Sequence, residues 1–340
     1  MKKVSLNQLN NVFAAIAKDG SLYIPVDTDA GVAKFEKWED GKELSKALNT
    51  VRSAKDFFFP QVENMAEFKV EGKKIEVIDS RKEAEDFVMF GVRACDFRSF
   101  SILDKVYLVD PVDSYYKTRR DHATIVTLAC NEPEETCFCS TFGIDASEPG
   151  GDVSAWIAGE DMYFKANTEK GEALLAKMDG ALTEGDDKKV EETKAQIKAI
   201  IDKLPIKDLD MSRYNGEQLL SLFNDERWAE LSEACIACGT CTYVCPTCQC
   251  YDIREFDTGH GVKRFRCWDS CMYADFTKEA AGNPRSTQMQ RFRQRFMHKL
   301  VYFPANNDGE YGCVGCGRCV KKCPIHMNIV KVIKALGVEK

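Results

Sequence analysis

The chain has 340 residues, of which 44% are apolar and 30% charged, with sixteen cysteines and a formal net charge of −7. This length accommodates two domains with cores of their own, and the composition is that of a globular rather than a disordered or fibrous protein. The acidic balance argues against general affinity for nucleic acid. No run of about eighteen apolar residues and no signal-peptide core occurs, so we expect neither membrane insertion nor export.

The first part of the chain shows alternating strand and helix patterns. Ser5 and Gln8 form a capping-box pattern that predicts a helix stopping at Gly20. Runs rich in apolar and β-branched residues predict strands at residues 21–26, 74–78, 87–92 and 123–128. A further helix is predicted over residues 187–204, before Pro205. Because helical stretches separate several of the strands, we predict an N-terminal α/β domain over residues 1–205.

The remaining residues, 206–340, show mainly helical patterns. Asn215 and Gln218 predict the start of a helix that turns apolar residues toward a core, namely Leu219, Leu220, Phe223, Trp228 and Leu231. A last apolar helix is predicted over residues 328–336, before Gly337. The sequence therefore predicts an α+β protein of two domains, the second of them helical.

Eight cysteines in this second domain form two copies of the pattern Cys-x2-Cys-x2-Cys-x3-Cys-Pro. The first run is Cys235, Cys238, Cys241 and Cys245, and the second is Cys313, Cys316, Cys319 and Cys323. This spacing is typical of proteins with two [4Fe-4S] clusters, in which the fourth cysteine of each run binds the cluster of the other run. We therefore predict that Cys323 completes the first-run cluster and Cys245 the second-run cluster, within an α-helical ferredoxin-like domain.

Zinc and disulfides are weaker alternatives for these two runs. Structural zinc sites usually combine two separated pairs of cysteines rather than a triplet with a remote fourth ligand. Cysteines three apart on a tight turn have poor geometry for a disulfide, which also suits secreted proteins. Reduced cysteines in this number indicate the cytoplasm, and an anaerobic organism.

The other eight cysteines form two further sets of four. Cys95 and Cys130 follow predicted strands, and ligand sites in open α/β sheets collect at the carboxyl ends of strands. With the following loop they make the first set: Cys95, Cys130, Cys137 and Cys139. The second set follows the first run closely: Cys248, Cys250, Cys267 and Cys271. Each set predicts one more iron-sulfur cluster, with zinc binding or inert buried thiols as the alternatives.

One basic segment, at Arg285 and residues 291–299, stands out in an acidic chain. On a helix, its aromatic residues would face inward, and Arg291, Arg295 and Lys299 would line an outer edge. A solvated helix face is the plain interpretation. The functional alternatives are that these cations offset the charge of a cluster or bind an acidic electron carrier.

The sequence shows no catalytic pair of acids or histidines and no nucleotide-binding motif. The glycines of residues 312–317 only imitate a dinucleotide fingerprint, because they lie among cysteines rather than between a strand and a helix. No Walker sequence occurs. We therefore expect hydride-handling chemistry to belong to another polypeptide.

Several of these segments together resemble a known family, the 4Fe-4S dicluster proteins that include sulfhydrogenase beta subunits and a related subunit of anaerobic sulfite reductase. The resemblance rests on residues 93–96, 137–139, 235–251, 268–272, 298–299 and 313–319. It implies an iron-sulfur subunit that relays electrons between a flavin- and NAD(P)-binding partner and a catalytic partner such as a hydrogenase, a sulfite reductase or a heterodisulfide-reductase-like unit. A ferredoxin is a further candidate partner. In this family Cys267 is the least regular position.

The sequence therefore predicts an electron-transfer subunit of a cytoplasmic, anaerobic oxidoreductase complex, with no membrane or nucleic-acid partner. One alternative is a reductase in which an extra cluster with an open iron position acts on a substrate. Another is a zinc-binding scaffold without redox chemistry. The favoured hypothesis predicts about eight to sixteen irons per chain.

Overall fold

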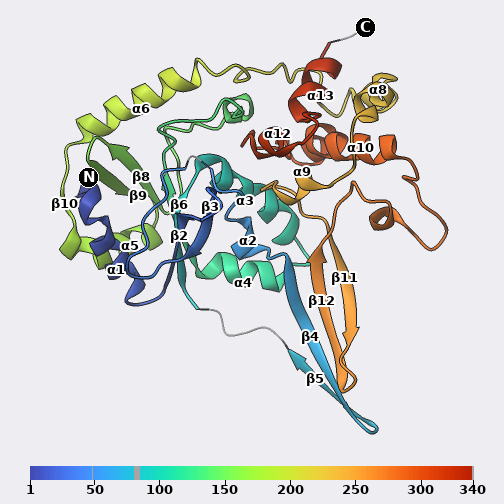
Figure 1. Cartoon of the computed structure of the whole chain (residues 1–340), viewed down its shortest axis with the longest axis horizontal. Coiled ribbons are helices and arrows are strands. Elements are labelled where there is room, and N and C mark those ends of the chain that lie inside the picture. Colours follow the sequence, from blue (N-terminus) through green and yellow to red (C-terminus); the bar gives the residue numbers. More distant parts are fainter. Residues whose placement is uncertain (48, 80–84, 339–340) are drawn as a thin grey trace.

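An eight-stranded sheet organises the first half of the chain (Figure 1). The computed structural model describes residues 1–47, 49–79 and 85–338. The strand order is β10-β1-β9-β8-β7-β6-β2-β3, and β2, β6, β7 and β8 are parallel neighbours. The strand bounds are Lys2–Ser5 (β1), Ser21–Asp27 (β2), Ala33–Lys37 (β3), Phe87–Val92 (β6), Ala123–Leu128 (β7), Val153–Ala158 (β8), Asp161–Ala166 (β9) and Thr183–Glu184 (β10).

Helices cover both faces of this sheet, as the alternating pattern predicts. Two helices share a core with one face: α1 (Leu9–Ala17) and α5 (Glu169–Met178). Four helices pack on the other face: α2 (Lys55–Phe58), α3 (Ala94–Tyr107), α4 (Ser114–His122) and α6 (Asp187–Ile201). The predicted strands at residues 21–26, 87–92 and 123–128 are confirmed, and so is the helix that begins at residue 187.

The predicted capping box at the start of the chain was wrong. Ser5 ends strand β1, and its side chain caps no helix. Residues 2–5 pair with β9 and bury Val4, so the chain begins with a strand instead. The pairing with β9 extends to Leu6, whose backbone amide donates to Glu160 O at 2.8 Å. Helix α1 begins at Leu9, after a turn of 3-10 helix at Leu6–Gln8.

A second sheet joins segments that lie far apart in the sequence. Its order is β11-β12-β4-β5, and β12 pairs with β4 in antiparallel fashion. The two hairpins extend away from the rest of the molecule (Figure 1). The strand bounds are Val62–Glu71 (β4), Lys74–Asp79 (β5), Tyr251–Asp257 (β11) and Gly261–Trp268 (β12).

This second sheet corrects the expectation of purely helical structure between the two cysteine runs. Strand β5 was predicted, but its partner β4 and the hairpin of β11 and β12 were not. Strands β5 and β11 are exposed along most of their length, so neither carries the clear alternation of buried and polar residues that marks a half-buried strand. This sheet takes strands from both sides of residue 205. The division into two domains at that residue therefore stays a prediction.

The C-terminal part of the chain is cysteine-rich and mainly helical. Its longer helices are α8 (Arg227–Glu233), α10 (Gln288–Met297) and α13 (Ile329–Leu336), which share a core. A π-helical turn at His298–Tyr302 continues α10. The shorter helices are α7 (Leu219–Phe223), α9 (Thr240–Tyr243), α11 (Phe303–Asn306) and α12 (Arg318–Lys322), and short 3-10 turns lie at Cys139–Phe142, Asp179–Ala181 and Asp275–Thr277.

The single helix predicted after Asn215 is two helices, α7 and α8. Asp225 breaks it, because its carboxylate accepts from the Arg227 backbone amide at 3.0 Å and starts a new helix. Leu220 is 71% exposed rather than buried. The last predicted helix is confirmed, with Asn328 as its N-cap. Across the part of the chain that the structure describes, every helix is too short or too polar to span a membrane.

Candidate metal centre

The first cysteine run lies near the surface, around the short helix α9. Cys238 is exposed, and the other three cysteines of the run are half-buried. Gly239 has a φ of 73° and starts α9, so a left-handed residue turns the chain between the second and third cysteines. The Gln288 side-chain amide donates to Cys235 Sγ at 3.3 Å. Hydrogen bonds of this kind suit sulfurs that carry negative charge.

The second run is more deeply placed, because it packs against the loop at residues 136–139. The Phe138 backbone amide donates to Gly315 O at 2.9 Å. A Cβ at Gly315 would lie 2.4 Å from Phe138 O, and one at Gly317 would lie 2.6 Å from Thr136 O. Both glycines also have positive φ. Only glycine fits these two positions without moving the backbone of the loop.

Cys245 of the first run lies near the leading cysteines of the second run. Burial raises the pKa of Cys313 to about 12, and Cys319 and Cys245 add to the rise. Burial, with Cys245 as a lesser cause, also raises the pKa of Cys316 and Cys319. This is the neighbourhood that crossed ligation requires of Cys245. The Cys323 thiol donates to Met327 O at 3.2 Å, and its role in the first-run cluster stays a prediction.

The N-terminal set of cysteines gathers at the carboxyl ends of two parallel strands. Cys95 lies in the first turn of α3, shortly after β6, and Cys130 lies two residues after β7, so their predicted positions at strand ends are confirmed. Burial raises the pKa of Cys137 and Cys139 to about 12, and the nearby Cys130 adds to both shifts. The structure thus brings these thiols together in buried surroundings.

A buried ion pair joins this N-terminal set to the second run. Arg318 donates from Nη1 and Nη2 to Asp96 Oδ1 and Oδ2 at 2.5 and 2.7 Å, and from Nε to Thr50 O at 2.9 Å. Burial raises the pKa of Cys95, and Asp96 and Cys316 add to the rise, so Cys95 and Cys316 are near neighbours. This contact was not predicted from the sequence. A signal for it existed, because Arg318 lies inside the second cysteine run and Asp96 directly follows Cys95.

The second extra set of cysteines divides in the structure. Cys248 forms a thiol hydrogen bond with Cys245, and Cys250 forms one with Cys271. The bond from Cys271 is the main cause that lowers the pKa of Cys250 to about 7. Lys299 lies near Cys248, Cys250 and Cys271.

Cys267 is placed differently from these three thiols. It lies on β12 opposite Asp252, in a strand that turns Arg266 and Trp268 inward. Since successive residues of a strand face opposite sides, Cys267 faces away from that interior. Its charged neighbours are Arg254, Asp252 and Asp269 rather than cysteines. A site that includes all four cysteines of this set stays a prediction.

Arg295 and Lys299 are buried among the cysteines, so the prediction that they line an outer edge was wrong. Their exposed fractions are 2% and 5%. They occupy the same helical stripe as the buried residues Phe292, Phe296 and Leu300, because positions three and four apart share a face. Their burial favours the alternative in which these cations offset negative charge within the cysteine region.

The surroundings of these two cations fit an anionic iron-sulfur group. Lys299 Nζ donates to Thr247 Oγ1 at 2.6 Å and Gly312 O at 3.0 Å. Arg295 donates to Cys241 O at 3.3 Å, and its Nε is buried without a hydrogen-bond partner. Within the described ranges neither cation pairs with a carboxylate. Burying an unpaired ion costs several kcal/mol, and cysteine thiolates with iron would supply the missing negative charge.

The donor groups are spaced differently from those of a site for a single ion. Among the residues described here, no three histidine, cysteine, aspartate or glutamate side chains converge closely enough to bind one metal ion. A single zinc ion draws four sulfurs to about 2.3 Å from one centre. A four-iron cube holds each cysteine on a different iron, and so spreads its four ligands more widely.

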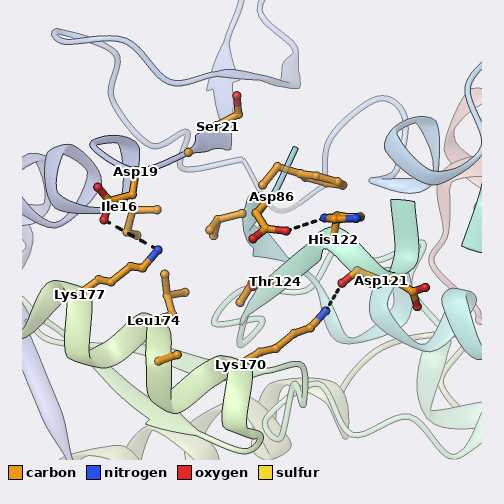
Figure 2. Close-up of a pocket in the computed structure, with 14 residues that line it drawn as sticks. Ile16, Asp19, Ser21, Asp86, Asp121, His122, Thr124, Lys170, Leu174 and Lys177 are labelled. Atoms are coloured by element: carbon orange, nitrogen blue, oxygen red, sulfur yellow. Dashed lines mark hydrogen bonds and ion pairs between the residues drawn. The ribbon is translucent and has the colours of Figure 1, made fainter. Parts of the chain in front are cut away.

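Cavities lie at both ends of the parallel strands of the sheet domain. One, of about 210 Å³, adjoins the amino ends of the parallel strands, away from the cysteines, and its charged residues pair with one another (Figure 2). There, His122 Nδ1 lies 2.7 Å from Asp86 Oδ1, and Lys170 donates to Asp121 O at 2.5 Å. Another, of about 470 Å³, lies at the carboxyl ends and is lined by Arg93, Leu128 and Asn131 among others, but not by Cys130.

Comparisons with known proteins agree with these features. The family model of the 4Fe-4S dicluster domain matches residues 234–327, which contain both cysteine runs. The chain is 32% identical over 332 residues to a protein of Pyrococcus furiosus named sulfhydrogenase 2 subunit beta, covering 94% of this chain and 93% of that protein. No solved structure matches.

Proposed function

The chain belongs to the family of sulfhydrogenase beta subunits, and from this premise we propose that it carries electrons between two partner subunits of an oxidoreductase complex. One partner would bind flavin and NAD(P), and the other would be catalytic, such as a hydrogenase, a sulfite reductase or a heterodisulfide-reductase-like unit. Iron-sulfur clusters, when bound, supply reversible one-electron storage. No side chain of this chain then needs to donate a proton.

One observation carries the proposal: the thiol groups form a continuous series across the chain. The exposed Cys238 marks one end of the series, and Cys130, at the edge of the sheet, marks the other. Between them, Cys245 lies near the second run, and Cys316 of that run lies near Cys95. Such a series supports electron passage through the chain from one partner to another.

Each group of residues has a role in this proposal. The two runs would bind two clusters by crossed ligation, and Cys95, Cys130, Cys137 and Cys139 would bind a third. Gly315 and Gly317 allow the second run to pack directly against the N-terminal loop. The Arg318–Asp96 ion pair would fix the distance between the second-run cluster and the third one.

A second candidate function is a reductase that uses the N-terminal cluster on a small substrate. It is favoured by the cavity of about 470 Å³ lined by Asn131, the residue after Cys130, whose Oδ1 is buried without a hydrogen-bond partner. Turnover of a substrate by the isolated chain with an artificial electron donor would support this candidate, and an inert chain would support the relay.

The test is anaerobic purification followed by iron and acid-labile sulfide analysis. The relay predicts a brown protein with about eight to sixteen irons per chain, and Cys130→Ser should lower this by about four irons. A colourless protein that contains zinc and no sulfide would contradict the proposal. An unchanged iron content in Cys130→Ser would remove the third cluster from it.

A further inference from the structure

Lys55, from the opposite end of the sequence, joins Lys299 inside the cysteine region. Its side chain is 2% exposed, and its Nζ donates to Cys248 O at 2.9 Å and lies 3.6 Å from the centre of the Trp268 ring. Burial lowers the pKa of Lys55, although the nearby Cys248 and Cys245 act in the opposite direction. The lysine therefore lies deep in the protein, with neutral groups as its contacts.

Both lysines lie on the side of the site that contains Cys245. Burial lowers the pKa of Lys299, but Cys245, Cys248 and Cys313 more than offset this, and the pKa is raised. Lys55 has Cys248 and Cys245 as its nearest thiols. Among the described residues, neither lysine forms an ion pair with a carboxylate, so their charge acts directly on the sulfurs.

The first run also has a buried cation beside it, Arg295, which donates to Cys241 O. Arg295 lies near Cys319, Cys248 and Cys245 as well. Among the described residues, no buried lysine accompanies Arg295 at the predicted fourth ligand of the first-run cluster. Lys322 lies one residue before Cys323, the predicted fourth ligand of the first-run cluster, but its side chain is exposed. Solvent and salt screen an exposed charge strongly, whereas a buried charge acts through a medium of lower dielectric constant. A lysine therefore influences the sulfurs through its burial near them, and not through its closeness to a ligand in the sequence.

We propose that Lys55 and Lys299 make the second-run site the place where the chain holds an electron. This site is formed by Cys313, Cys316, Cys319 and Cys245. The inference rests on the proposed function, since it requires the clusters. Acceptance of one electron adds one negative charge to this site, and no bond or proton needs to change. Positive charge on these two lysines favours that state, so it raises the reduction potential of the site.

A purely structural role for the lysines would be to hold Thr247, Gly312 and the Cys248 carbonyl in place. The two roles differ in what each substitution changes. Loss of a structural contact would lower iron content or stability. Loss of a charge that favours the electron would move the potential while the iron content stays the same. Lys299→Arg, which keeps the charge, should retain the potential close to the unsubstituted value.

The experiment is a redox titration of the full-length iron-loaded chain with dithionite, followed by electron paramagnetic resonance. Lys299→Met and Lys55→Met should each move the midpoint of one cluster signal to more negative potential, and the double variant should move it further. Lys322→Met, the exposed control, should leave every midpoint unchanged. Cys238→Ser, which removes the first-run signal, and Cys130→Ser, which removes that of the N-terminal cluster, together identify the second-run signal.

Iron and sulfide contents, measured on the same samples, test the proposed function separately. Iron-loaded Lys55→Met with an unchanged midpoint would overturn the inference, and so would an equal shift in Lys322→Met. It would also fail if the shifted signal were the one lost in Cys238→Ser or in Cys130→Ser. If Lys299→Met does not retain its iron, Lys55→Met alone decides the result, by whether its midpoint moves to more negative potential.

Discussion

The two cysteine runs have the same spacing but different surroundings. Ile236 follows the first cysteine of the first run and is 62% exposed, whereas Val314, at the equivalent position of the second run, is 2% exposed. Thr240 of the first run corresponds to Arg318, which is buried against Asp96. The difference arises because the N-terminal part of the chain packs against the second run at Val314, Gly315 and Arg318, whereas the first run is open at the corresponding positions.

One pair of equivalent positions shows how this covering acts on the backbone. Ala237 and Gly315 both precede the second cysteine of their run and have φ values of 54° and 59°. The left-handed conformation is thus common to the two runs, and alanine adopts it where the surroundings are open. Gly315 has no room for a methyl group, because Phe138 O is too close. Ligand spacing fixes the local turn, and the neighbouring domain fixes which residues are allowed in it.

The largest difference between the runs is expected from Cys316→Ser and Cys238→Ser. Each should remove about four irons. Cys316 lies in a core with Cys95 and Cys139, so its substitution should also lower the stability of the sheet domain, because metal binding contributes to folding. Iron analysis and anaerobic thermal unfolding measure both effects. Equal losses of stability in the two variants would contradict the comparison.

Arg318→Met should destabilise the chain by about 3–5 kcal/mol, because it leaves the Asp96 carboxylate buried and unpaired. Adding Asp96→Asn should recover part of the loss, since the double variant buries no isolated charge. Anaerobic denaturant unfolding gives the free energies. Thr240→Val, at the equivalent position of the first run, should have little effect. A comparable loss from this control would show that the two positions are not electrostatically different.

Gly315→Ala should cost on the order of 2–3 kcal/mol, because a Cβ meets the Phe138 carbonyl and alanine is strained at positive φ. The reverse change in the first run, Ala237→Gly, should alter stability by no more than about 1 kcal/mol. Both values come from the same unfolding measurements. If Gly315→Ala proved as mild as Ala237→Gly, the second run would not be held tightly against the loop.

The smallest effect concerns pH and the helix that carries Lys299. Burial, with Lys299 and Arg285 nearby, lowers the pKa of His298 from its ordinary 6.5 to about 4. Because this pKa is lower in the folded chain than in the unfolded one, the neutral histidine contributes to stability at pH values above about 6.5. That contribution is lost as the pH falls from about 6.5 toward 4. Between pH 7 and pH 5 the loss should be about 2 kcal/mol.

His298→Gln should show a smaller change in unfolding free energy between pH 7 and pH 5 than the unsubstituted chain. The difference between the two proteins isolates this histidine from the acid sensitivity of the clusters. Identical pH dependence in both would mean that His298 has the same pKa in the folded and the unfolded chain.

The sequence predicted the chemistry of the chain better than its packing. Cysteine spacing identified the two runs, and strand patterns placed Cys95 and Cys130 at neighbouring strand ends, because both signals are local. The burial of Arg295 and Lys299 was not predicted. Their charge indicates a solvent-exposed position, whereas their spacing along the helix places them on the same face as buried residues, and the prediction followed the charge. The proposed clusters would supply a buried anion that resolves this conflict, and their cysteines lie far from α10 in the sequence.

The contacts between distant segments were beyond a single sequence. The hydrogen bond between Phe138 and Gly315 and the bond from Lys55 to Cys248 join residues that no periodic pattern relates. Strands β11 and β12 were missed for a similar reason. Their pairing with β4 compensates for the weak local preference of exposed strands, and such pairing depends on the whole fold.

The sheet formed by β4, β5, β11 and β12 has a consequence for how the chain is made. Its two hairpins are separated by roughly 180 residues, and the entropy of closing so long a loop slows their pairing. During synthesis, β4 and β5 must wait until both strands of the later hairpin have left the ribosome. The sheet therefore closes only after the whole first cysteine run, which precedes β11, has been synthesised.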